Sequence, residues 1–156
     1  MAISILPADL ETPEFVALID RHAALMLDIT PEGSCHFLPI DGLKTPDVTV
    51  WQIRADGELV GSGALKALST THGEIKSMHT LDAHRGKGLA QVMLDHIIQE
   101  AKARGYDRLS LETGQPPAFS AALRLYERNG FSVCGPFGEY VEDPHSVFMT
   151  RQFSEN

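Results

Sequence analysis

The chain has few cysteines and fewer positive than negative charges. Its 156 residues include two cysteines, and 13 lysines and arginines against 21 aspartates and glutamates give a net charge of −8. Cys35 and Cys134 lie far apart without metal-ligand spacing, which is typical of ordinary thiols in a cytoplasmic protein. A nucleic acid is not expected as a partner, because duplex-binding proteins usually present a basic face.

Long hydrophobic runs are also missing. No apolar segment approaches the roughly 20 residues that span a bilayer, and the first residues lack the pattern of a secretory signal, so no membrane association is expected. The length and the 43% hydrophobic content predict a single domain over residues 1–156. The acidic composition serves solubility or favours a cationic substrate.

Helical and strand-like patterns alternate along the chain. TPEFVALIDRHAALML (12–27) has apolar residues at helical spacing after Thr12, a candidate N-cap, and Pro13, which suits a first helical turn. Two strand-like runs flank Asp56 and Gly57, a dipeptide typical of tight hairpin turns. Residues 28–47 contain three prolines and two glycines without a sustained period, which favours a functional loop. A short helix or a mobile surface loop is the alternative.

The second half of the chain predicts a crossover. A long amphipathic helix follows residue 88 and ends near Gly105, and RLSLET (108–113) then predicts a strand. PAFSAALRLYERNGF (117–131) predicts another helix, and HSVFMTRQF (145–153) a last strand. The order predicts an α/β (α+β) fold with a mixed, mostly antiparallel sheet of six to seven strands and helices on both faces.

A glycine-rich turn stands between strand and helix in MHTLDAHRGKGLAQVMLDH (78–96). Gly86 and Gly88 could let a phosphate approach the open N–H groups of a helix, and Arg85 and Lys87 would add positive charge. A plain strand-to-helix turn is the alternative. The spacing of a P-loop fails, because Gly88 follows the lysine and the upstream glycine is missing. A dinucleotide fingerprint lacks its third glycine, where Gln91 stands.

RGKGLA (85–90) matches R-x-x-G-x-[GA], and AALRLYERNGF (121–131) is similar to an A-x-x-L-Y-x-x-x-G-F segment. Together they resemble the GNAT N-acetyltransferase superfamily, over nearly the full chain and in particular a bacterial subgroup of small enzymes. The resemblance implies a GNAT fold whose central strands splay apart at the site for acetyl-CoA. A homodimer is also compatible with it, since dimers are common in this superfamily.

The resemblance also assigns residues to the co-substrate. The pyrophosphate of coenzyme A would rest on the backbone of the turn, and the pantetheine arm would pair with the preceding strand like an added strand. The cofactor-binding residues it implies are Met78, Thr80, Arg85, Gly86, Lys87, Gly88, Leu89 and Ala90. No metal is expected, because the histidines show no ligand pattern.

Acetyl transfer to an amine benefits from a general acid and a general base. Tyr126 matches the family tyrosine that faces the thioester sulfur, although ordinary helix packing is the alternative. Glu74 is the candidate base, because strand alternation would place it on the same face as Met78 and Thr80, with His79 on the other face. A histidine or a water molecule could serve as the base instead, and Glu74 could be an ordinary exposed glutamate of the strand.

Four residues are candidate substrate contacts. Ser34 and His36 lie in the long loop, and Glu112 and Thr113 end the strand that should splay. Many family members carry an asparagine seven residues before the tyrosine, where Phe119 stands here, so that cofactor contact is not carried over.

The predicted function is acetyl-CoA-dependent N-acetylation of a primary amine in a small molecule or peptide, by direct attack in a ternary complex. A non-enzymatic acyl-CoA sensor and a nicotinamide-dependent protein are the alternatives, and the acceptor is not identified.

Overall fold

The computed structural model describes residues 2–29, 40–81, 86 and 88–153. The strands are β1 (Ile3–Pro7), β2 (Val48–Ala55), β3 (Glu58–Ala67), β4 (His72–Thr80), β5 (Arg108–Gly114), β6 (Ser132–Cys134) and β7 (Ser146–Gln152). The helices are α1 (Pro13–Ile29), the 3-10 helix η2 (Ile40–Lys44), α2 (Leu89–Ala103) and α3 (Ser120–Arg128).

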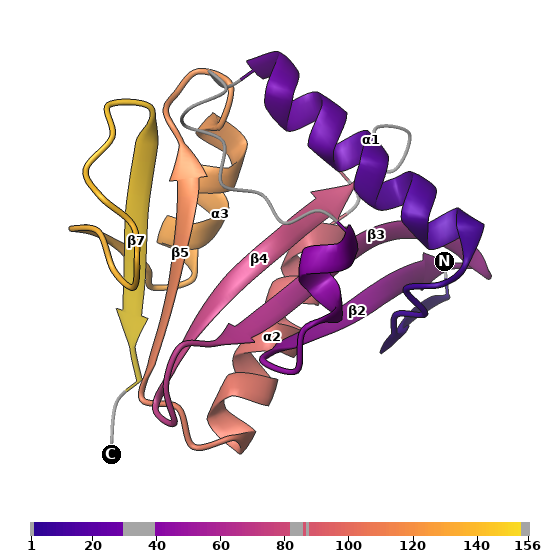
Figure 1. Ribbon diagram of the computed structural model, residues 1–156, viewed down its shortest axis with the longest axis horizontal. Coiled ribbons are helices and arrows are strands. Elements are labelled where there is room, and N and C mark those ends of the chain that lie inside the picture. The colour runs from indigo at the N-terminus through magenta and orange to yellow at the C-terminus, as the bar shows by residue number, and fades with distance from the viewer. Residues whose placement is uncertain (1, 30–39, 82–85, 87, 154–156) are drawn as a thin grey trace.

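The seven strands form one sheet in the order β1-β2-β3-β4-β5-β7-β6 (Figure 1). Neighbouring strands are antiparallel except β4 and β5, which α2 joins by a crossover. The mixed sheet confirms the predicted fold class.

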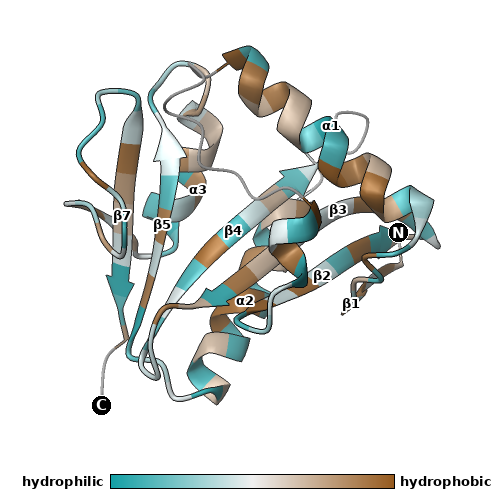
Figure 2. Cartoon of the chain, viewed as in Figure 1, coloured by the Kyte–Doolittle hydropathy of each residue, from teal (hydrophilic) through white to brown (hydrophobic). Residues whose placement is uncertain are grey.

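Helices cover both faces of the sheet, as predicted. In Figure 1, α1 and η2 lie in front of the sheet and α2 and α3 lie behind it. Phe15, Leu18 and Ile19 of α1 pack on the front, and Met93 and Ile97 of α2 are buried at the back. Brown and teal patches alternate along α1 in Figure 2, as expected of an amphipathic helix. Each large apolar side chain buried in this way contributes about 1.5–3 kcal/mol.

A glycine of β3 sets how close α2 lies to the sheet. A Cβ on Gly63 would stand 2.6 Å from Met93 Cγ and 3.0 Å from Ile97 Cδ1. Any larger residue would therefore push α2 away from β3. The helix contacts β4 as well as β3.

Local signals in the sequence account for most element ends. Thr12 Oγ1 accepts a hydrogen bond of 3.3 Å from the Phe15 backbone N–H, as an N-cap does. Asp56 and Gly57 both have positive φ, as the predicted two-residue hairpin turn requires. Gly105 has φ 82° just after α2, which confirms it as the left-handed residue that ends the helix.

Two features differ from the predicted elements. The last helix begins at Ser120, because the paired prolines Pro116 and Pro117 disfavour helical conformation before and between them. The edge strand β6 has three residues, too few for a periodic pattern. Within the residues that the structure describes, no helix is long and apolar enough to cross a membrane.

Candidate active site

The two central strands separate halfway along their length. β4 and β5 pair only at His72↔Arg108, Gly73↔Leu109 and Glu74↔Ser110, although both strands continue beyond these pairs. Figure 1 shows them diverging from there. β4 stays with β3 up to Thr80, and β5 stays with β7 up to Gly114. The predicted splay is confirmed.

A cavity of about 660 Å³ lies at this opening. It is lined from α1, β4, the glycine turn, α2, β5 and α3. Past Glu74, the edge of β4 that faces β5 pairs with no strand in the described part of the chain. Its backbone groups can therefore pair with an extended ligand arm.

A bulge in β4 changes which face its side chains occupy. Ser77 has φ 55°, and Ser77 and Met78 together lie opposite the single residue Gly63. Ser62 Oγ donates a 2.7 Å hydrogen bond to the carbonyl oxygen of Ser77 and supports this conformation. The extra residue shifts the alternation of side chains for the rest of the strand.

The predicted alternation along β4 is therefore wrong. Met78 packs with the core behind the sheet. Ile75 belongs to the same rear core, so its neighbour in the strand, Glu74, lies on the front face. His79 lies in front instead, with its ring centroid 4.8 Å from that of His22 in α1. Glu74 and Met78 occupy opposite faces of the strand, yet both line the cavity.

The glycine turn leaves the start of α2 open. Gly86 and Gly88 have φ 79° and 77°, and a Cβ on either would meet no atom within 4 Å. Gly88 caps α2 without any side-chain hydrogen bond. The first N–H groups of the helix are thus open to an anion. Leu89 is buried at this end, and Ala90 lines the cavity; Arg85 and Lys87 lie outside the described residues.

Tyr126 reaches the cavity from α3. Its ring packs edge-on against Phe131, with centroids 5.7 Å apart, and the residue is buried. Burial raises the pKa of the Tyr126 phenol well above its usual value of 10, so the hydroxyl keeps its proton at neutral pH. Tyr126 can therefore act as a hydrogen-bond donor inside the cavity.

A buried hydrogen-bonded trio occupies the point where β4 leaves β5. Glu74 Oε2 accepts hydrogen bonds from Tyr140 Oη at 2.6 Å and from Lys76 Nζ at 3.2 Å. Lys76 Nζ also donates to Tyr140 Oη at 2.9 Å. Burial and the negative charge of Glu74 raise the pKa of Tyr140 well above its usual value. Glu74 thus already has two donors, which weakens it as a candidate base.

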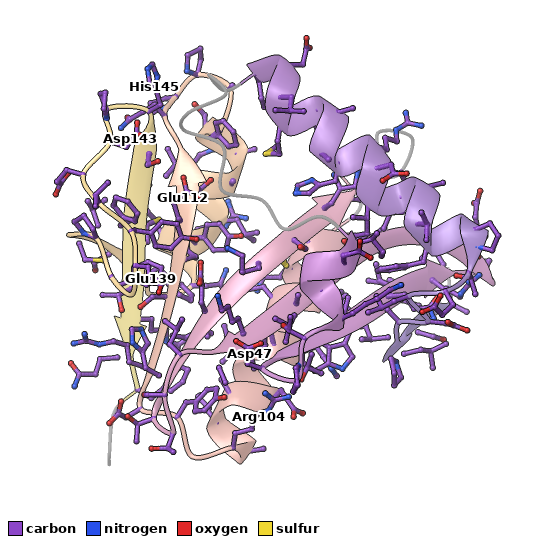
Figure 3. All side chains as sticks on the ribbon, viewed as in Figure 1. Asp47, Arg104, Glu112, Glu139, Asp143 and His145 are labelled. Carbon is purple, nitrogen blue, oxygen red and sulfur yellow. The ribbon has the colours of Figure 1, made fainter. Side chains whose placement is uncertain are left out.

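Glu112 lies one step further into the opening. It is two residues beyond Ser110, the last residue of β5 that pairs with β4, and it lies on the front face of the sheet with Ser110. Figure 3 shows it on β5, with Asp143 and His145 on the segment that leads into β7. Burial raises the pKa of Glu112 to about 7, against the opposing effects of the Ser146 hydroxyl and the Lys76 ammonium.

The predicted substrate contacts have different outcomes. Glu112 and Thr113 both line the cavity, and as neighbours in a strand they approach it from opposite faces of β5. Ser34 and His36 lie outside the described residues. Phe119, at the position of the family asparagine, also lines the cavity; Gly114 makes room for its ring, because a Cβ there would overlap it.

Two residues of the candidate site, Tyr140 and His22, are not predicted from the sequence. Tyr140 stands 66 residues from Glu74, in a segment rich in glycine and proline, and no local pattern indicates their contact. His22 lines the cavity and belongs to the buried stripe of α1 with Phe15, Leu18 and Ile19. The helical spacing of His22 with these buried residues is the sequence signal that could have indicated its position.

Comparison with known proteins assigns the family. The model of the acetyltransferase (GNAT) family matches residues 12–131, and the chain belongs to this family. An uncharacterized N-acetyltransferase of Bacillus subtilis, YsnE, is 49% identical over 92% of this chain and 95% of its own. The chain is therefore an acetyltransferase enzyme.

Solved structures agree on the fold. A candidate acyl-CoA N-acyltransferase from Klebsiella pneumoniae has a TM-score of 0.79 and 31% identity, over 97% of this chain and 98% of its own. A GNAT family acetyltransferase from Elizabethkingia anophelis, solved with acetyl-CoA bound, has a TM-score of 0.68 and 17% identity, with the same coverage.

Within the described residues, no three His, Cys, Asp or Glu side chains are grouped as metal ligands.

Proposed function

We propose that this enzyme transfers an acetyl group from acetyl-CoA to a primary amine of a small molecule or peptide, by direct attack in a ternary complex. The observation that supports the proposal is the cavity between the splayed strands. This cavity brings together the edge of β4 that no described strand covers, the open start of α2 and the buried Tyr126. The acetyl-CoA bound in the Elizabethkingia relative supports the same co-substrate here.

The co-substrate would lie along β4 and end at α2. Backbone groups of Met78 and Thr80 would pair with the pantetheine arm, since the edge of β4 has no strand beside it there. Gly86, Gly88, Leu89 and Ala90, with Arg85 and Lys87, would hold the pyrophosphate. The open N–H groups at the start of α2 and the helix dipole favour an anion at this place.

The acceptor would enter on the front face, where Glu112 lies, with Thr113 across β5 and with Ser34 and His36 from the loop. The neutral amine attacks the thioester carbonyl carbon, so that a C–N bond forms as the C–S bond breaks. The nitrogen gives up a proton to a carboxylate, and the departing thiolate is stabilised by the Tyr126 hydroxyl. No cysteine lines the described cavity, which favours direct attack over a covalent intermediate.

We further propose that residues 1–156 act as one domain in the cytoplasm, where the acidic composition and the two distant cysteines fit. A homodimer is compatible with the exposed edge strand β6.

Two measurements test the proposal. Isothermal titration calorimetry should detect binding of both acetyl-CoA and coenzyme A, and failure of both to bind at about millimolar concentration, where any useful co-substrate binds, would refute it. A panel of amino acids, polyamines, aminoglycosides and peptides, followed by release of free thiol, should then reveal an acetylated amine. Tight co-substrate binding with no thiol release across the panel would favour the sensor alternative instead.

A further inference from the structure

We propose that Glu112, and not Glu74, takes the proton from the acceptor amine, and that Glu74, Lys76 and Tyr140 form a positioning trio beside it. This inference rests on the proposed acetyl transfer and names the base for that reaction. Glu74 and Glu112 are the only carboxylates that line the cavity among the described residues, so a carboxylate base must be one of these two.

Glu74 is poorly placed to gain a proton. Its Oε2 already accepts the 2.6 Å bond from Tyr140 and the 3.2 Å bond from Lys76. The side chains of Glu74 and Lys76 are 4% and 8% exposed. An amine that approached Oε2 would have to displace one of these two donors. Glu74 is therefore already engaged within the trio.

Glu112 faces the opening itself. The last paired residues of the two strands are Glu74 and Ser110, and Glu112 lies beyond that point on the same face, where β4 has turned away. Its neighbours on β5 and β7 hold the backbone in regular pairing, with Glu112 opposite Phe148. A carboxylate on a rigid strand at the mouth of the opening can meet an incoming amine without moving the backbone.

The surroundings of Glu112 tune it for proton transfer. The charged and titratable groups around it are Glu74 and Lys76 of β4, Tyr140 and Asp143 of the segment between β6 and β7, and His145 at the cavity wall. Burial outweighs the attraction of Lys76 and raises the pKa of Glu112 to about 7. A base is most effective when its pKa lies near the working pH.

The proton balance is complete without any further reactant. One N–H proton of the amine passes to Glu112 as the C–N bond forms, and Glu112 then releases it to solvent. The thiolate leaves with the electron pair of the C–S bond and gains a proton from Tyr126 or solvent, and Tyr126 is reprotonated from solvent. The products are the N-acetylated amine and the free thiol of coenzyme A.

Kinetics against pH test the assignment, with acetyl-CoA and the amine that the panel identifies. The wild type should show an acid limb of kcat/KM near pH 7, and Glu112→Gln should remove this limb and lower kcat by roughly 10²-fold or more. Glu112→Asp should keep the acid limb with a lower rate, because it shortens the reach but retains the charge. Glu74→Gln should keep the acid limb as well.

The exposed Glu127 of α3 provides a matched control, and Glu127→Gln should behave like the wild type. Glu112→Gln with wild-type kcat and an intact acid limb would overturn the assignment, as would loss of that limb in Glu74→Gln alone. Calorimetry with coenzyme A separates this result from failure of the proposed function, because Glu112→Gln should bind coenzyme A like the wild type. Carboxyl ¹³C NMR provides a readout without an acceptor, since one signal that titrates near pH 7 should vanish in Glu112→Gln.

Discussion

At the scale of single residues, the site depends on two tyrosines with different tasks. Tyr126 lines the cavity and keeps its proton because it is buried. The Tyr140 hydroxyl instead donates a hydrogen bond to Glu74 and accepts one from Lys76. The same type of side chain is therefore available as a donor inside the cavity in one place and links two other side chains in the other.

Replacement of Tyr126 should slow the reaction without weakening co-substrate binding. Tyr126→Phe removes the hydroxyl that would stabilise the thiolate, and loss of one such donor typically costs about 10²-fold in kcat. The dissociation constant of coenzyme A by calorimetry should stay within about twofold, since the proposed pyrophosphate contacts are backbone groups of the turn. An unchanged kcat would show that the tyrosine serves only packing against Phe131.

Replacement of Tyr140 should lower stability. Tyr140→Phe leaves the buried Glu74 and Lys76 without the bridging hydroxyl, and we expect a loss of about 1–3 kcal/mol in the free energy of unfolding. Urea denaturation of Tyr140→Phe, Glu74→Gln and the double variant measures the coupling between the two side chains. Strictly additive losses would mean that the charge of Glu74 adds nothing to the 2.6 Å bond.

At the scale of elements, the glycine turn and the β4 bulge are the two backbone features that shape the proposed co-substrate site. The turn has positive φ at Gly86 and Gly88, and no atom of the described residues lies within 4 Å of a Cβ built on either. The bulge at Ser77 turns Met78 to the rear face of the sheet. Both features are backbone conformations, so backbone substitutions should reveal their roles.

Gly88→Ala should weaken binding of coenzyme A at least fivefold. Alanine at φ 77° is strained by about 1 kcal/mol and would shift the N–H groups that start α2. Gly57→Ala is the matched control, because Gly57 has φ 84° in the β2–β3 turn and likewise has no atom within 4 Å of a built Cβ. Both variants should lose similar stability, but only Gly88→Ala should lose affinity in calorimetry. Equal affinities would remove the turn from the binding site.

At the scale of the whole molecule, titration of Glu112 should make the free energy of unfolding depend on pH. The pKa of Glu112 is raised from 4.5 to about 7 in the folded chain. The folded state therefore holds this proton more tightly than the unfolded state between those values. The contribution of Glu112 to stability is greatest below pH 4.5 and falls as pH rises toward 7.

The expected size of this effect is at most about 3 kcal/mol, since each unit of pKa difference corresponds to about 1.4 kcal/mol. Urea denaturation from pH 4.5 to 8 should show the wild type losing stability relative to Glu112→Gln across that range, with little further change above it. Parallel curves for the two proteins would mean that Glu112 titrates normally in the folded state.

The sequence alone determined the order of the elements, the glycine turn and the identity of the family. Such features depend on local patterns: Thr12 caps α1, Asp56 and Gly57 form the hairpin turn, and Gly105 ends α2. Chemistry that is local in the chain can be predicted from neighbouring residues, because propensity and turn conformation act over a few positions.

The tertiary structure alone decided which carboxylates are available for chemistry. Strand alternation misplaced Glu74 relative to Met78, because the bulge at Ser77 is fixed by its pairing with β3 and by the bond from Ser62. Tyr140 reaches Glu74 from 66 residues away, and only the folded sheet brings them together. Burial of Glu112 and its raised pKa likewise follow from packing across β4, β5 and β7, which no local pattern encodes.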